Sequence, residues 1–141
     1  MQHNSILALD VGGKRIGVAV ASIIARLPRP LITLDNDDGF MASLQNIIEI
    51  EDVGAIVVGY PRDMQGDSTQ QTQEVEAFTA KLRQEFAMPI IYQDEALTSK
   101  HAEAELDSKK KGYARGDIDS LAATYILQDF LNDPKNLNEL A

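Results

Sequence analysis

The residues of this sequence best suited to chemistry are four acids that stand where the pattern places the ends of structural elements: Asp10, Asp94, Glu95 and Asp119. Asp10 closes an apolar, β-branched run at residues 5–11. An ionised carboxylate on a buried strand is costly unless it is paired or bound to a metal ion. Its alternative role is to accept hydrogen bonds in the Gly12-Gly13 turn that follows.

The other three acids follow a strand or open a helix. Asp94 and Glu95 come directly after the apolar run at 90–93, so their side chains should point to opposite sides, with at least one on the Asp10 side. Either acid alone is equally consistent with a solvated loop. Asp119 heads the apolar column of a helix that continues through Ala123 and Ile126, so it should face the sheet. A residue that only complements the helix dipole needs no such orientation.

Carboxylates gathered at one edge of a sheet repel each other unless they share a proton or hold a hard cation. Oxygen ligands alone favour Mg²⁺ or Mn²⁺. Two such ions about 3.5–4 Å apart activate the attacking hydroxide and stabilise the leaving oxygen in a phosphoryl displacement. We therefore expect Asp10, Asp119 and at least one of Asp94 and Glu95 to be the catalytic metal ligands of a phosphodiester hydrolase.

Basic residues near these acids are candidates for positioning phosphate: Lys14, Arg15, Arg62 and Lys100. The net charge of −9 argues against binding of nucleic acid through overall basicity, so local clusters must supply it. The lysine run at 109–111 is either a clamp on the substrate or a solvated loop. His101 is a further candidate for proton transfer, although a lone histidine is more often incidental.

Hydrophobic periodicity predicts the elements that carry these residues. Strands are expected at 5–11, 15–22, 31–34, 55–59 and 90–93, and helices at 40–50, 71–86, 98–106 and 117–131. The first two strands form a tight antiparallel hairpin around Gly12 and Gly13. Two βαβ crossovers make the first, fourth and fifth strands parallel. The prediction is an α/β fold with a mixed five-stranded sheet and helices on both faces.

Length and composition predict one domain over residues 1–131 and a poorly ordered tail over 132–141. The 141 residues contain no cysteine, which excludes disulfide frameworks, thiol nucleophiles and zinc ribbons. No basic leader and no membrane-length apolar stretch is visible, so we expect a cytoplasmic protein. The oligomeric state is not predicted.

The sequence resembles the YqgF-type (RuvX-type) family, described as pre-16S rRNA nucleases and as Holliday-junction-resolvase-like. The matching stretches are LALDVGGKRIGVAVAS at 7–22, IVVGYPRDMQG at 56–66, DEALTS at 94–99 and IDSLAATYILQDFL at 118–131. The resemblance implies a ribonuclease H-like fold, divalent-metal nuclease chemistry and catalytic metal ligands at Asp10, Glu95 and Asp119, with Asp94 beside them. It also implies a role in ribosome biogenesis, at the 5′ end of precursor 16S rRNA, with ribosomal particles as partners.

Two positions depart from the family pattern, which usually has Arg and Asp where this sequence has Ala96 and Ile23. The residues and the resemblance together leave three hypotheses. The first is a metal-dependent ribonuclease, the second a nuclease that cuts Holliday junctions or other branched DNA, and the third a non-catalytic module that binds RNA or the ribosome. Nucleotide handling of the actin or sugar-kinase kind needs a second domain, for which the sequence is too short.

Overall fold

A computed structural model describes residues 3–61, 69–94 and 115–140 of the chain. These residues form one five-stranded sheet in the order β3-β2-β1-β4-β5. Its strands are β1 (Ser5–Val11), β2 (Arg15–Ser22), β3 (Arg29–Asp35), β4 (Val53–Tyr60) and β5 (Ile90–Asp94). The expected mixed sheet is confirmed, and the first two strands have the predicted bounds.

The hairpin of β1 and β2 is closed by the short turn at Gly12 and Gly13. The backbone N–H of Gly12 donates to the carbonyl of Arg15 at 2.9 Å. A Cβ on Gly12 would lie 2.8 Å from that carbonyl oxygen, so only glycine fits this turn without a shift. The antiparallel register pairs Asp10 with Gly17, which places the acid opposite a residue without a side chain.

The parallel half of the sheet runs from β1 through β4 to β5. β4 pairs in parallel with β1 and with β5, as the two predicted crossovers require. β4 is buried along nearly its whole length, which explains its continuous apolar sequence. The carboxyl ends of β1, β4 and β5 therefore share one edge of the sheet, where ligands usually bind in α/β proteins.

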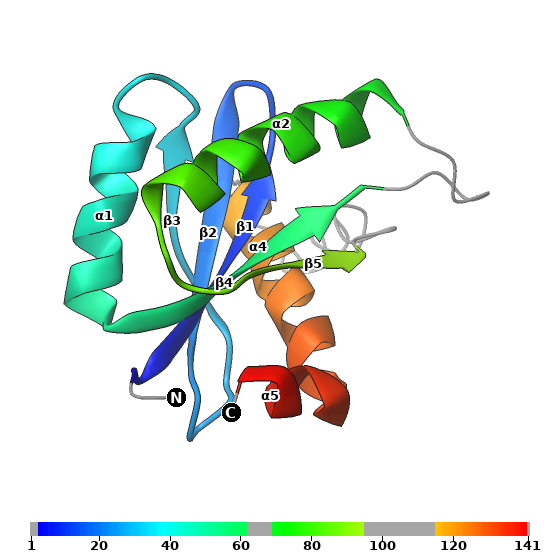
Figure 1. Cartoon of the computed structure of the whole chain (residues 1–141). Helices are drawn as coiled ribbons and strands as arrows, with labels where there is room; N and C mark the ends of the chain where they lie inside the picture. Colours follow the sequence, from blue (N-terminus) through cyan, green and yellow to red (C-terminus); the bar gives the residue numbers. More distant parts are fainter. Residues whose placement is uncertain (1–2, 62–68, 95–114, 141) are drawn as a thin grey trace, which may run out of the picture.

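Helices cover both faces of the sheet (Figure 1). They are α1 (Phe40–Glu51), α2 (Gln70–Glu85), α4 (Arg115–Asn132) and α5 (Pro134–Leu140). α1 and α2 lie on one face and α4 on the other. Thr69 caps α2 with a capping box, because its hydroxyl accepts a hydrogen bond from the N–H of Thr72. None of the described helices is long and apolar enough to cross a membrane.

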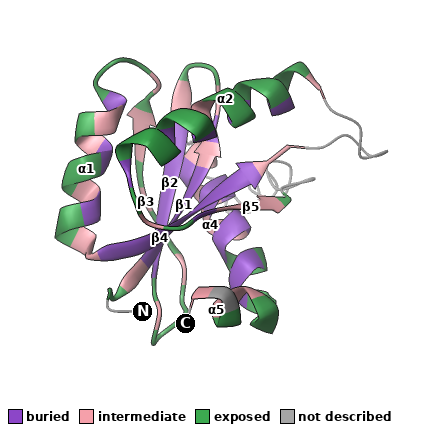
Figure 2. Cartoon of the chain, viewed as in Figure 1, coloured by how far each residue is buried: buried purple, intermediate pink, exposed green. Residues whose placement is uncertain are grey.

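Two separate hydrophobic clusters fill the two faces, and Figure 2 shows the central strands and the inner side of α4 as buried. On the α1 and α2 face, large residues such as Leu7, Leu9 and Leu44 dominate. On the α4 face the sheet contributes mainly small residues, including Ala8 and Ala19. Each β1 side chain thus belongs to one face or the other, as strand alternation requires.

The C-terminal segment differs from the expected poorly ordered tail, because residues 134–140 form α5. Pro134 occupies its first position, where proline is well tolerated, and Asp133 accepts a hydrogen bond from the N–H of Lys135. Leu137 and Leu140 pack against the cluster on the α4 face. α5 lies against the end of α4, where Asn136 Nδ2 donates to the Phe130 carbonyl at 2.9 Å. The helix expected at 98–106 lies outside the described residues.

Candidate active site

Asp10 lies at the carboxyl end of β1, on the face covered by α4. Its neighbours at alternate positions, Ile6 and Ala8, belong to the cluster that packs against α4, and strand alternation continues that face to Asp10. The residue is partly buried. The structure thus places a partly buried carboxylate at the carboxyl end of β1.

Gly17 brings the first described turns of α4 against the sheet beside Asp10. A Cβ on Gly17 would lie 1.9 Å from the backbone carbonyl oxygen of Asp119 and 2.7 Å from the backbone nitrogen of Ser120. Because Gly17 is also the register partner of Asp10, Asp10 and Asp119 both adjoin this one glycine. The fold therefore brings together two of the predicted metal ligands, from segments more than 100 positions apart.

The Asp119 carboxylate forms an ion pair with Arg15. Arg15 Nε donates to Asp119 Oδ2 at 2.7 Å, with side-chain exposures of 33% for Arg15 and 23% for Asp119. The sequence predicted both residues in the site but not that they pair. One feature of the sequence could have indicated the pair: Arg15 and Gly17 are two residues apart, so they lie on the same side of β2, which faces Asp119.

Asp94 is not brought together with Asp10 and Asp119. Its strand neighbours Ile90 and Tyr92 pack in the cluster of the α1 and α2 face, so alternation places Asp94 on that face as well. Asp94 is exposed, and its register partner is Tyr60. Asp94 is therefore not the member of the Asp94-Glu95 pair that faces Asp10, and Glu95 lies outside the described residues.

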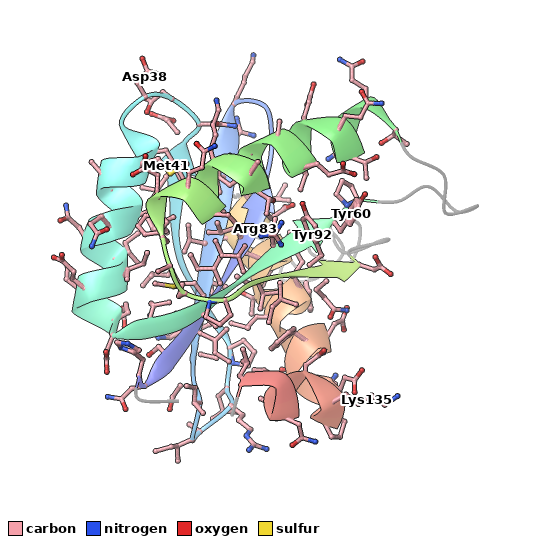
Figure 3. All side chains as sticks on the ribbon, viewed as in Figure 1. Asp38, Met41, Tyr60, Arg83, Tyr92 and Lys135 are labelled. Atoms are coloured by element: carbon pink, nitrogen blue, oxygen red, sulfur yellow. The ribbon has the colours of Figure 1, made fainter. Side chains whose placement is uncertain are left out.

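Two tyrosines and an arginine gather where β4 and β5 approach this edge, as Figure 3 shows. The rings of Tyr60 and Tyr92 lie 4.7 Å apart, and the Arg83 guanidinium lies 5.4 Å from the centre of the Tyr92 ring. The Tyr60 hydroxyl also donates to the Glu76 carboxylate. Sequence reasoning did not single out these residues. The tilted contact between the two rings and the contact with a cation hold this corner of the sheet together.

Several predicted site residues lie outside the described part of the chain: Glu95, Arg62, Lys100, His101 and the lysines at 109–111. Lys14 is described and exposed in the hairpin turn. Within residues 3–61, 69–94 and 115–140, no three histidine, cysteine or acidic side chains are close enough to hold a metal ion. Asp10 and Asp119 are nevertheless oxygen donors on one face, the chemistry that Mg²⁺ and Mn²⁺ prefer.

Comparison with curated proteins gives relatives that match almost the whole chain. A protein from Rickettsia typhi is 41% identical over 141 residues, covering 96% of this chain and 90% of its own length. A protein from Thermoanaerobacter pseudethanolicus is 39% identical and covers 93% of this chain and 98% of its own length. Both carry the name "Putative pre-16S rRNA nuclease".

Solved structures with a similar fold include RuvC of T. thermophilus in complex with a Holliday junction substrate. It has a TM-score of 0.52 at 13% identity and covers 92% of this chain and 94% of its own. The Fowlpox virus resolvase in complex with Holliday junction DNA has a TM-score of 0.53 at 10% identity, with coverages of 92% and 99%. These similarities establish the ribonuclease H-like fold. The family model described as "RuvX: Holliday junction resolvase" matches residues 4–133, and the chain belongs to the RuvX family.

Proposed function

We propose that this protein is a divalent-metal-dependent nuclease that processes the 5′ end of precursor 16S rRNA. The observation that carries the proposal is the placement of Asp10 and Asp119 beside Gly17, at the carboxyl end of β1. Acids on one face at this edge suit phosphodiester hydrolysis with metal ions. The names of the relatives from Rickettsia typhi and Thermoanaerobacter pseudethanolicus support RNA as the substrate.

In this proposal Asp10, Glu95 and Asp119 hold Mg²⁺ or Mn²⁺. The bound metal would supply a nucleophilic hydroxide and stabilise charge on the phosphate. Asp94 is the weaker candidate ligand, because alternation along β5 places it on the other face. The Arg15 guanidinium balances the charge of the Asp119 carboxylate and keeps that side chain against the sheet.

Phosphate positioning is assigned to Lys14, Arg15, Arg62 and Lys100. Arg15 Nε already binds Asp119, but a guanidinium carries five N–H donors in a planar fork and can bridge a carboxylate and a phosphate. Lys14 lies next to it in the exposed turn. Such cations beside the acids would hold a polyanion despite the net charge of −9. We further propose that the protein acts in the cytoplasm, on ribosomal particles.

The test is cleavage of precursor 16S rRNA by purified protein with Mg²⁺ or Mn²⁺. Asp10→Asn and Asp119→Asn should each lower the rate at least about 100-fold, since even indirect partners of metal ligands cost 10–100-fold. Asp129→Asn is the matched control, because Asp129 is an exposed acid on the same helix as Asp119. Equal cleavage by wild type and Asp10→Asn would remove the assigned site.

A second candidate substrate is branched DNA, favoured by the description of the matching family as Holliday junction resolvase. The same three variants, assayed on a four-way DNA junction, separate the two substrates. Faster cleavage of the junction than of precursor rRNA would replace RNA by DNA in the proposal. Binding of RNA without any cleavage in either metal would instead favour a non-catalytic module, the hypothesis motivated by Ala96.

A further inference from the structure

A polar hollow lies on the opposite face of the hairpin from Asp10. It is formed by the β1–β2 turn, the residue after β3 and the first three turns of α2, and has a volume of about 430 Å³. Its lining residues are Val11, Gly12, Gly13, Asn36, Gln71, Glu74, Val75 and Phe78. This volume falls within the range of about 300–1,000 Å³ typical of small-ligand sites.

The described lining residues suit a flat polar ring better than a phosphate group. None of the described lining residues is a cation, and Glu74 contributes a carboxylate that would repel phosphate. Val11, Val75 and Phe78 supply apolar walls. The Phe78 ring is held in place against Phe40, with ring centres 5.4 Å apart. Aromatic and apolar side chains of this kind contact the faces of unstacked nucleobases.

Glu74 and Gln71 together select one base. Guanine presents two adjacent donors, N1–H and N2–H₂, which match the two oxygens of a carboxylate, and its O6 can accept from the Gln71 amide. Uracil instead presents one N–H between two carbonyl oxygens, which a carboxylate repels. From the described residues, the Glu74 carboxylate accepts a long hydrogen bond of 3.4 Å from Gln70 Nε2. A better donor pair can replace that contact.

The turn at Gly12 and Gly13 joins this hollow to the acids. Val11 lines the hollow, and the preceding residue, Asp10, faces α4 across the same strand end. A Cβ on Gly13 would meet nothing within 4 Å, so the rim of the hollow is open. Asn36 Nδ2 donates to the Gly12 carbonyl at 2.8 Å and fixes the turn. A nucleic acid strand can therefore cross the turn with a phosphate on one side and a base on the other.

We propose that this hollow binds a guanine base of the substrate strand, next to the phosphate held at the Asp10 face. The proposal rests on the proposed nuclease function and adds a specificity site to it. Glu74 and Gln71 read the Watson–Crick edge of the base, while Val11, Val75 and Phe78 contact its ring.

The experiment measures binding of labelled six-nucleotide RNAs by fluorescence anisotropy, with Asp10→Asn as the background that leaves RNA intact. The probes are oligouridine and the same oligomer with one guanosine or one adenosine. We expect the guanosine oligomer to bind about tenfold more tightly than oligouridine, the effect of one good bidentate contact with a base. Glu74→Gln should reduce that ratio to near one. Glu85→Gln, an exposed acid on the same helix, should preserve it.

A ratio near one in the Asp10→Asn background, equal binding of the adenosine and guanosine oligomers, or a ratio unchanged by Glu74→Gln would overturn the proposal. Glu74 is exposed, so its substitution leaves the core intact, and thermal unfolding of the variant checks this. The outcome is separable from that of the cleavage assay. RNA cleavage without guanine preference removes only the base site, whereas guanine preference without cleavage removes only the nuclease function.

Discussion

The two faces of the sheet are packed in different ways, and each way suits the role that we propose for that face. On the α4 face, small residues let the helix backbone approach the strands: Ala8, Gly17, Ala19 and Ala21 from the sheet, with Ala122 and Ala123 from the helix. On the other face, large side chains such as Leu7 and Leu44 separate sheet and helices. The close face fixes Asp119 beside Asp10, and the wider face leaves the hollow at the hairpin.

The difference shows that the α4 face holds its residues in closely fixed positions, whereas the α2 face has space for a ligand. Two carboxylates that hold one ion must be fixed to within fractions of an ångström, and direct contact between backbones achieves this. A ligand site needs room, which remains where the first turns of α2 extend beyond the large core residues. Changes that add atoms should therefore damage the α4 face most.

The largest effect is expected for Gly17→Ala. Its added Cβ would lie 1.9 Å from the Asp119 carbonyl oxygen, so α4 must move away from β2. We expect a loss of about 3 kcal/mol in the free energy of unfolding, at the upper end for overpacking, and a loss of nuclease activity. Urea denaturation measures the first. Gly13→Ala is the control, because its Cβ meets nothing within 4 Å and should change stability by less than about 0.5 kcal/mol.

An intermediate effect on the wider face is expected for Thr69→Ala. The variant loses the capping box at the start of α2, which should cost about 1 kcal/mol and speed amide exchange in the first turn of this helix. Amides of α4 should exchange as in wild type. Thr69→Ser keeps the capping hydroxyl and should behave like wild type. Faster exchange in α4 as well would show that the two faces are coupled.

The smallest effect on stability is expected for Arg15→Gln. The ion pair with Asp119 is partly exposed, so its loss should cost only about 0.5 kcal/mol without metal. Mg²⁺ should then raise the melting temperature more than in wild type, because the Asp119 carboxylate no longer has a competing cation. Arg15→Lys keeps the positive charge, so the rise in melting temperature with Mg²⁺ should lie between the values for wild type and Arg15→Gln. A smaller Mg²⁺ effect in Arg15→Gln would mean that Arg15 helps to form the metal site.

Much of the fold could be read from local patterns. Alternation and two turn glycines gave the first hairpin with its observed bounds, and the apolar run at 55–59 gave the buried central strand β4. The helices α1 and α2 end within one residue of their predicted bounds. These elements are set by short-range periodicity, which a sequence displays directly. The helix at 134–140 was missed because seven residues are too few to show a clear helical period, and Leu137 and Leu140 gain burial only by packing against the cluster on the α4 face.

The candidate site was only partly accessible from the sequence. The acids at strand ends, Asp10 and Asp94, could be located from the sequence. The sequence alone did not say which member of the Asp94-Glu95 pair faces Asp10. In the structure, the packing of Ile90 and Tyr92 places Asp94 on the α2 face. The adjacent residues Ile90 and Ile91 are both apolar, and they pack on opposite faces of the sheet. Apolarity therefore does not show which face each residue of β5 belongs to. A period of two fixes alternation but not its phase.

The sequence by itself determined the strands, the turn and the identity of the acids, because these depend on residue type and short spacing. Only the tertiary structure decided that Asp119 adjoins Gly17 and pairs with Arg15, and that a hollow opens behind the hairpin. The physical reason is distance along the chain. Contacts between residues separated by 100 positions arise from packing of whole elements, which no local pattern records.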